Sequence, residues 1–127
     1  MHTSVYENMS NAEHAVCAHL KQLGLWWHYE QPVFVYDHME RPRVWTPDFY
    51  IPELGIYIEV MGSRQLSNYD FREKIYLLNR IPIIFLDIQH RDWRTTLAEH
   101  IRDIHDRRSE RIKGSLQQEH KDKGEVA

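Results

Sequence analysis

The chain is 127 residues long, with 42% hydrophobic residues, 28% charged residues and a formal net charge of −3. These values are ordinary for a single globular domain that buries a core. No apolar run approaches the roughly 18 residues of a membrane-spanning helix, and the polar N-terminus is unlike a secretory signal, so we expect no membrane partner. The negative charge argues mildly against nucleic-acid binding, because phosphate contacts need Lys and Arg. The single cysteine, Cys17, cannot form an internal disulfide and indicates a reducing, cytoplasmic setting.

The N-terminal part of the chain predicts one helix followed by one strand. Ser10 or Asn11 can cap a helix, and Gly24 is suited to end it. Between them, apolar residues recur at steps of three and four, as an amphipathic helix requires: Ala12, Ala15, Val16, Leu20 and Leu23. Aromatic and β-branched residues over 25–36 then predict a strand, in which Pro32 marks an edge or a break.

The remaining elements alternate strands with helices, separated by turns rich in Pro, Gly and Asp. We expect strands at 44–50, 56–61 and 81–88, and helices at about 67–79 and from 92 onward. This order predicts a single α/β domain over residues 1–106, with a mixed sheet of about four strands flanked by helices. Apolar spacing fades beyond about Arg107, so we expect residues 107–127 to form a flexible polar extension.

Two acidic residues, Asp48 and Glu59, fall on neighbouring predicted strands. Antiparallel neighbours in a suitable register bring their side chains within roughly 5 Å of each other. Carboxylates that close repel each other unless a cation lies between them, and an oxygen-only pair suits Mg²⁺. A bound metal of this kind acidifies a water and stabilises charge on phosphorus. The alternative is a surface hairpin with two solvated acids, but Glu59 lies between Ile58 and Val60, where acids are rarely present for packing.

These residues carry a resemblance to a known superfamily of enzymes. Pro47-Asp48, followed by Glu59-Val60-Met61-Gly62, resembles the active-site motif of the PD-(D/E)XK nucleases, in which Lys stands at the position of Met61. The layout over about residues 10–88, which begins with a helix containing Glu13, is most similar to the phage junction-resolving endonucleases of the Holliday-junction resolvase type. The resemblance implies a restriction-endonuclease-like fold, cleavage of DNA, possession of a Mg²⁺ cofactor that Mn²⁺ can replace, and a homodimer in a phage or bacterial setting.

The resemblance also implies roles for particular residues. Asp48, Glu59 and the carbonyl of Val60 would bind the metal, and Glu13 would be an outer or second-metal ligand. Met61 would occupy the position of the lysine that places the attacking water and balances charge. Methionine has only a weakly accepting sulfur and no charge, so this position is the main departure from the family.

Three explanations of Met61 are open. In the first, the chain is naturally inactive and only binds DNA. In the second, the lysine was replaced deliberately to give an inactive form. In the third, a basic residue from elsewhere in the fold takes the place of the lysine. The candidates for that base are Arg72 and Lys74 on the following helix and Arg64 just after the strand. If the site lacks only this group, restoring it by Met61→Lys should raise cleavage by orders of magnitude.

Other basic residues indicate how a nucleic acid could be held. Arg41 and Arg43 precede the Pro47-Asp48 pair and, with Arg64, are the best phosphate clamps, to which Arg72 and Lys74 can add. The nine histidines show no metal-binding spacing. The alternatives to an endonuclease are a non-catalytic nucleic-acid-binding module on the same scaffold and a small interaction domain without a nucleic-acid role.

Overall fold

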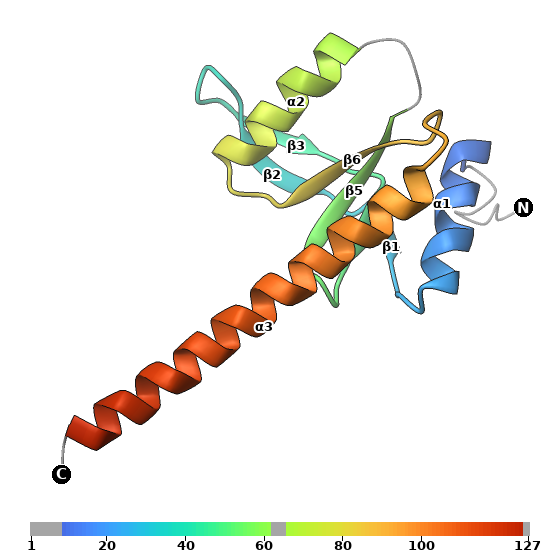
Figure 1. The fold of residues 1–127 in the computed structure, drawn as a ribbon. Coiled ribbons are helices and arrows are strands. Elements are labelled where there is room, and N and C mark those ends of the chain that lie inside the picture. Colours follow the sequence, from blue (N-terminus) through green and yellow to red (C-terminus); the bar gives the residue numbers. More distant parts are fainter. Residues whose placement is uncertain (1–8, 62–65, 126–127) are drawn as a thin grey trace, which may run out of the picture. The chain divides into compact units, whose positions relative to one another are not determined.

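The computed structural model describes residues 9–61 and 66–125. It confirms a mixed α/β fold. The chain divides into two compact units, Met1–Trp93 and Arg94–Ala127 (Figure 1). The helices and strands of the described residues follow in the order α1 (Asn11–Gln22), β1 (His28–Tyr29), β2 (Val33–Tyr36), β3 (Pro42–Trp45), β4 (Phe49–Ile51), β5 (Ile56–Met61), α2 (Leu66–Leu78), β6 (Ile83–Asp87) and α3 (Trp93–Glu125).

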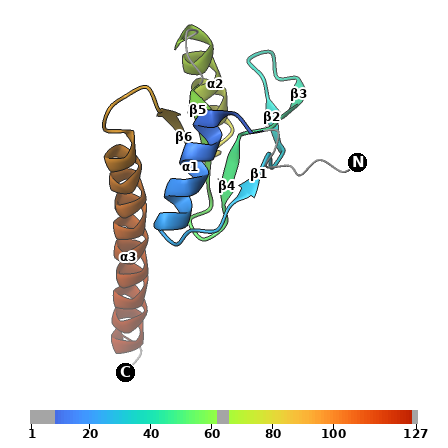
Figure 2. The same cartoon turned by 90° about the vertical axis from the view of Figure 1, so that its right-hand side faces the viewer.

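A mixed four-stranded sheet forms the centre of the first unit. Its strand order is β1-β4-β5-β6, and β4 and β5 lie side by side in the middle (Figure 2). β1 pairs with β4 and β4 with β5 in antiparallel fashion, whereas β5 and β6 are parallel. A parallel neighbour needs a crossover, and α2 provides it, as the sequence predicted for the strand that returns through a helix.

The first helix begins and ends close to the predicted residues. Ser10 caps it in a reciprocal capping box: the Ser10 hydroxyl accepts from the Glu13 amide at 3.1 Å, and the Glu13 carboxylate accepts from the Ser10 amide at 3.2 Å. Gly24 follows the C-cap with a φ of 72°, a left-handed conformation that glycine adopts without steric cost. Val16 and Leu20 are fully buried, as their spacing predicted.

Each of the first two predicted strands is split in the structure. The sequence indicated an edge or a break in the first, at Pro32, but predicted the second as continuous over 44–50, and this is a correction. Residues 25–36 form β1 and β2 because Glu30 adopts a φ of 58° and Pro32 lacks a ladder donor. Residues 44–50 divide between β3 and β4 at the segment 46–48. β2 and β3 therefore leave the main sheet and pair only with each other, as a two-stranded hairpin.

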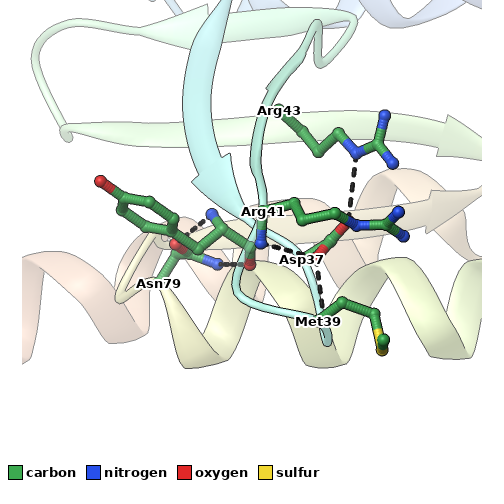
Figure 3. A network of polar contacts seen from close by, with 6 residues as sticks. Asp37, Met39, Arg41, Arg43 and Asn79 are labelled. Atoms are coloured by element: carbon green, nitrogen blue, oxygen red, sulfur yellow. Dashed lines mark hydrogen bonds and ion pairs between the residues drawn. The ribbon is translucent and has the colours of Figure 1, made fainter.

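Asn79, just after α2, fastens this hairpin to the helix. Its Nδ2 donates to the Tyr36 carbonyl at 2.9 Å, and its Oδ1 accepts from the Tyr36 amide at 2.8 Å (Figure 3). Its Nδ2 also donates to the Ile75 carbonyl at 2.7 Å. The inward face of the hairpin, Val33 and Val35, is buried in one cluster with Ile75 and with Tyr76 of α2. The end of α2 and the end of β2 are thus joined by both packing and hydrogen bonds.

The predicted turn after β2 is organised by Asp37. Its Oδ1 accepts from the amides of Met39 at 2.8 Å and Arg41 at 2.9 Å, and its Oδ2 accepts from Nε of Arg43 at 3.1 Å (Figure 3). The amide of Arg41 and these other donors hold the pKa of the Asp37 carboxyl well below its usual range, against the opposing effect of burial.

The second unit consists of α3 from Arg94 onward. The helix continues to Glu125, whereas the sequence predicted that regular structure would be lost at about residue 107. Exposed charged residues sustain helices through pairs four apart, and Arg107 forms such a pair with Asp103 at 3.1 Å. In the part of the chain that the structure describes, no helix is both long and apolar enough to cross a membrane.

Replacing Asn79 by Ala should lower the free energy of unfolding by about 1–3 kcal/mol, because three hydrogen bonds disappear and the Tyr36 and Ile75 backbone groups lose partners. Chemical denaturation of the full chain measures this value. Leu78→Ala is the matched control, since Leu78 is 75% exposed, and it should change stability by less than about 0.5 kcal/mol. Equal stability of the Asn79→Ala variant and the original chain would show that packing alone holds the hairpin.

Candidate active site

Asp48 lies one residue before β4, at the point where the chain returns from the hairpin to the main sheet. β4 pairs with β5 so that Phe49 faces Ile58, and one further step in this register brings Asp48 opposite Glu59. Oδ2 of Asp48 accepts a hydrogen bond from the Val60 amide at 2.7 Å. The predicted pair of acids is therefore brought together on neighbouring strands.

Glu59 is a charged residue buried in a central strand, with only 6% of its surface exposed. Its Oε1 lies 3.0 Å from Nη2 of Arg72 on α2. Its Oε2 is buried and has no hydrogen-bond partner among residues 9–61 and 66–125. A buried carboxylate oxygen without a donor is costly, so this oxygen has a coordination position available for a cation or a donor from a ligand.

The two acids are held in an environment that disfavours their charged forms. Burial raises the pKa of Asp48 to about 6, with the charge of Glu13 adding to the rise and the Val60 amide opposing it. Burial, followed by the charge of Asp48, raises the pKa of Glu59 to about 7, and Arg72 opposes this rise. Carboxylates perturbed by burial and by each other are characteristic of functional sites, although structural networks can perturb them as well.

Glu13 contributes to the same environment from α1. Its Oε1 is used by the capping box, and its Oε2 is buried with no hydrogen-bond partner in the described part of the chain. Burial and then the Glu13 carboxylate raise the pKa of Tyr29 on β1 above its usual range. Glu13 thus has two roles, since one oxygen caps the N-terminus of α1 and its charge acts on Asp48 and Glu59.

Arg72 is surrounded by side chains that the sequence did not identify. Its guanidinium lies over the ring of Trp45, 5.8 Å from the ring centroid, and Trp45 meets the ring of Tyr76 edge-on at 5.2 Å. Burial lowers the pKa of Arg72, but the charges of Glu59 and Tyr76 and the hydrogen bonding to both side chains together raise it above its usual value. The spacing of four between Arg72 and Tyr76, on one face of a helix, was the signal available in the sequence.

The oxygen atoms at this point of the sheet fit a divalent cation. The amide and carbonyl of one strand residue point to the same edge, so the Val60 carbonyl is directed past the start of β4, beside Asp48. Together with the unpartnered Oε2 of Glu59 this gives an oxygen-only donor set, as Mg²⁺ prefers, and Mg²⁺ commonly takes one or two protein carboxylates. Among the described residues, no group of three or more His, Cys, Asp or Glu side chains is arranged to hold a metal ion.

The other residues that the sequence predicted for the site lie on β5 and on the hairpin. Met61 is half-buried at the end of β5, in register with Asp87 of β6. Arg41 and Arg43 lie on the hairpin, and both pair with Asp37, at 3.3 Å and 3.1 Å (Figure 3).

The other predicted bases are not part of the pair of acids. Lys74 is exposed on α2. Arg64, like Gly62 of the motif, lies outside the described residues. Cys17 is buried and its Sγ lies 3.6 Å from Sδ of Met9. Burial, followed by the charge of Glu13, raises its thiol pKa to about 11, whereas an activated nucleophile needs a lowered pKa.

No protein-family model, no curated protein and no solved structure matches this chain. The resemblance to PD-(D/E)XK nucleases stays a prediction from the motif and from the order of the elements.

The raised pKa values predict that the metal-free chain loses stability as pH rises. The unfolded chain releases these protons near pH 4, whereas folded Asp48 and Glu59 retain theirs up to about 6 and 7. The free energy of unfolding therefore falls between about pH 4 and pH 7. Asp48→Asn keeps the acceptor for the Val60 amide and should gain on the order of 1–2 kcal/mol relative to the original chain at pH 8, but little at pH 4.5.

Urea denaturation in the presence of a chelator, at both pH values, measures this difference. Asp70→Asn, an exposed position on α2, is the matched control and should follow the original chain at both pH values. A parallel pH dependence for Asp48→Asn and the original chain would contradict the burial of an ionisable Asp48.

Proposed function

We propose that this chain is a Mg²⁺-dependent DNA endonuclease with a restriction-endonuclease-like fold, whose metal site is formed by Asp48, Glu59 and the Val60 carbonyl. The observation that carries the proposal is the buried Glu59 carboxylate of β5, which has an unpartnered buried oxygen and lies beside the half-buried Asp48 just before β4. Two carboxylates this close repel each other without a cation, and a divalent cation held by such a pair can activate a water for phosphodiester hydrolysis.

The chain's own residues would hold this site in place before any substrate arrives. The Val60 amide fixes the Asp48 carboxylate at 2.7 Å, and Arg72 fixes the Glu59 carboxylate at 3.0 Å. When bound, the divalent cation would supply an acidified water and a positive charge next to the scissile phosphate. Fixed ligands lose little freedom on binding, and this preorganisation supports catalysis rather than simple binding.

The substrate and the oligomeric state follow from the same proposal. The junction-resolvase layout of the sequence favours branched DNA, and cutting two strands with one site per chain favours a homodimer. Arg41 and Arg43 on the exposed hairpin would contact phosphates, because each keeps donors beyond its bond to Asp37.

Metal binding tests the proposal without relying on cleavage. Millimolar Mg²⁺ or Mn²⁺ should raise the midpoint of thermal unfolding by about 2–8 °C, since a ligand of the native state stabilises it. Asp48→Asn and Glu59→Gln should abolish the shift, whereas the exposed control Asp70→Asn should retain it. Cleavage of a labelled four-way junction and of the matching linear duplex then identifies the preferred substrate. The absence of both a thermal shift and cleavage would refute the proposal.

The second candidate is a nucleic-acid-binding module without catalysis. Met61 at the lysine position favours it, and so does the pairing of Glu59 with a protein cation, Arg72. Such a module should bind DNA equally well in a chelator and as the Asp48→Ala variant. A gel-shift titration of both proteins, at two salt concentrations, separates this candidate from the endonuclease.

A further inference from the structure

We propose that Arg72 supplies, from α2, the positive charge that Met61 does not supply from β5. This inference rests on the proposed function and names the group that completes its site. Glu59 and Met61 are two residues apart on one strand, so their side chains leave the same face of the sheet. Arg72 reaches that face from the crossover helix and lies 3.0 Å from the Glu59 carboxylate.

The surroundings of Arg72 leave part of its guanidinium free for a phosphate. Its Cζ lies over Trp45, at 5.8 Å from the ring centroid, and one nitrogen, Nη2, lies 3.0 Å from the Glu59 carboxylate. A guanidinium carries five N–H donors in a fixed plane, and 31% of the Arg72 side chain is exposed. The ion pair with Glu59 uses one of the guanidinium nitrogens, so the remaining donors can contact a phosphate oxygen beside Glu59.

The other candidate bases are less suited to this position. Lys74 is exposed and lies two residues from Arg72, a separation that places two side chains on different faces of a helix. Arg64 lies outside the described residues. Arg41 and Arg43 lie on the hairpin and pair with Asp37, whereas Arg72 pairs with Glu59 itself.

Arg72 also differs from a lysine at position 61 in its chemistry. An arginine keeps its proton, so it cannot take one from the attacking water. It would therefore act through charge and hydrogen bonds on the phosphate, and the proton of the water would leave to solvent or to the substrate phosphate. The class of reaction is unchanged, namely hydrolysis, in which a water oxygen bonds to phosphorus as the bond from phosphorus to the leaving oxygen breaks.

Moving the charge between the two positions tests the inference. Arg72→Met should reduce cleavage in Mn²⁺ by about 100-fold or more, the scale on which removal of one transition-state donor acts. Arg72→Met combined with Met61→Lys should recover cleavage to within about 10-fold of the original chain, because the charge returns to the same face of the sheet. Asp87, in register with Met61, gives the new ammonium an acidic neighbour.

Three further proteins complete the series. Met61→Lys alone should change cleavage by less than about 10-fold, since Arg72 already supplies the charge. Arg72→Lys should retain part of the turnover, with a larger loss in kcat than in KM, because the ammonium keeps the charge but not the planar fork. Lys21→Met, which removes an exposed cation from α1, is the control and should cleave like the original chain.

The Mn²⁺-induced thermal shift of each variant reports folding and metal binding separately from cleavage. Full cleavage by Arg72→Met, or cleavage by Met61→Lys when the original chain is inactive, overturns the role of Arg72 and leaves the proposed function standing. If Arg72→Met does not fold, the double variant and Arg72→Lys decide, since both keep a cation beside Glu59. Absence of cleavage and of a Mn²⁺ shift in every protein refutes the proposed function, and the role of Arg72 with it.

Discussion

The ion pair between Glu59 and Arg72 is the interaction on which the α2 side of the sheet depends. Glu59 lies in β5, its carboxylate contacts Arg72 of α2, and only 6% of its surface is exposed. A buried carboxylate is tolerated when a cation and donors compensate its charge, and here the cation comes from the helix that connects β5 to β6. Because Arg72 must face the sheet, the rotation of α2 about its axis is fixed. Ile75 and Tyr76 then enter the core, at 1% and 0% exposure.

The hairpin of β2 and β3 positions both the aromatic ring beside Arg72 and the acid beside Glu59. The chain leaves the main sheet after β1 and returns to it at residues 46–48. Trp45, at the end of β3, therefore lies against Arg72 and Tyr76. Asp48, three residues later, lies beside Glu59. The same break in the strand therefore provides the ring that covers the guanidinium and the second acid of the site. Asn79 closes this arrangement at the far end of the hairpin.

Local signals in the sequence predicted local structure well and long-range partners poorly. The capping residues of α1, the strand at 56–61 and the α2 crossover were all predicted, because each depends on residues close in sequence. A break at Pro32 was indicated, but the split of the strand at 44–50 and the separate hairpin of β2 and β3 were missed, since the same β-branched and aromatic residues suit both a sheet and a hairpin that packs on a helix. The two acids were found from their apolar neighbours. Predicting the pair of Arg72 and Glu59 would have required the rotation of α2 about its axis, which the spacing of apolar residues fixes only approximately. Predicting the contact of Trp45 with Arg72 would have required the path of the chain through the hairpin, which no local pattern encodes.

The charge of the candidate site would make the binding of a phosphodiester depend on a bound metal. Glu13, Asp48 and Glu59 carry three negative charges when ionised, against the one positive charge of Arg72, so the site alone would repel a phosphodiester backbone at neutral pH. A bound divalent cation would bring these charges to balance, and substrate affinity would then depend on the metal, whereas a pure binding module would gain nothing from such acids beside a phosphate. The net charge of −3 is for this reason a weaker argument against a nuclease than against a binding module. An enzyme can bring its cations with the metal, but a binding surface must build them from its own side chains.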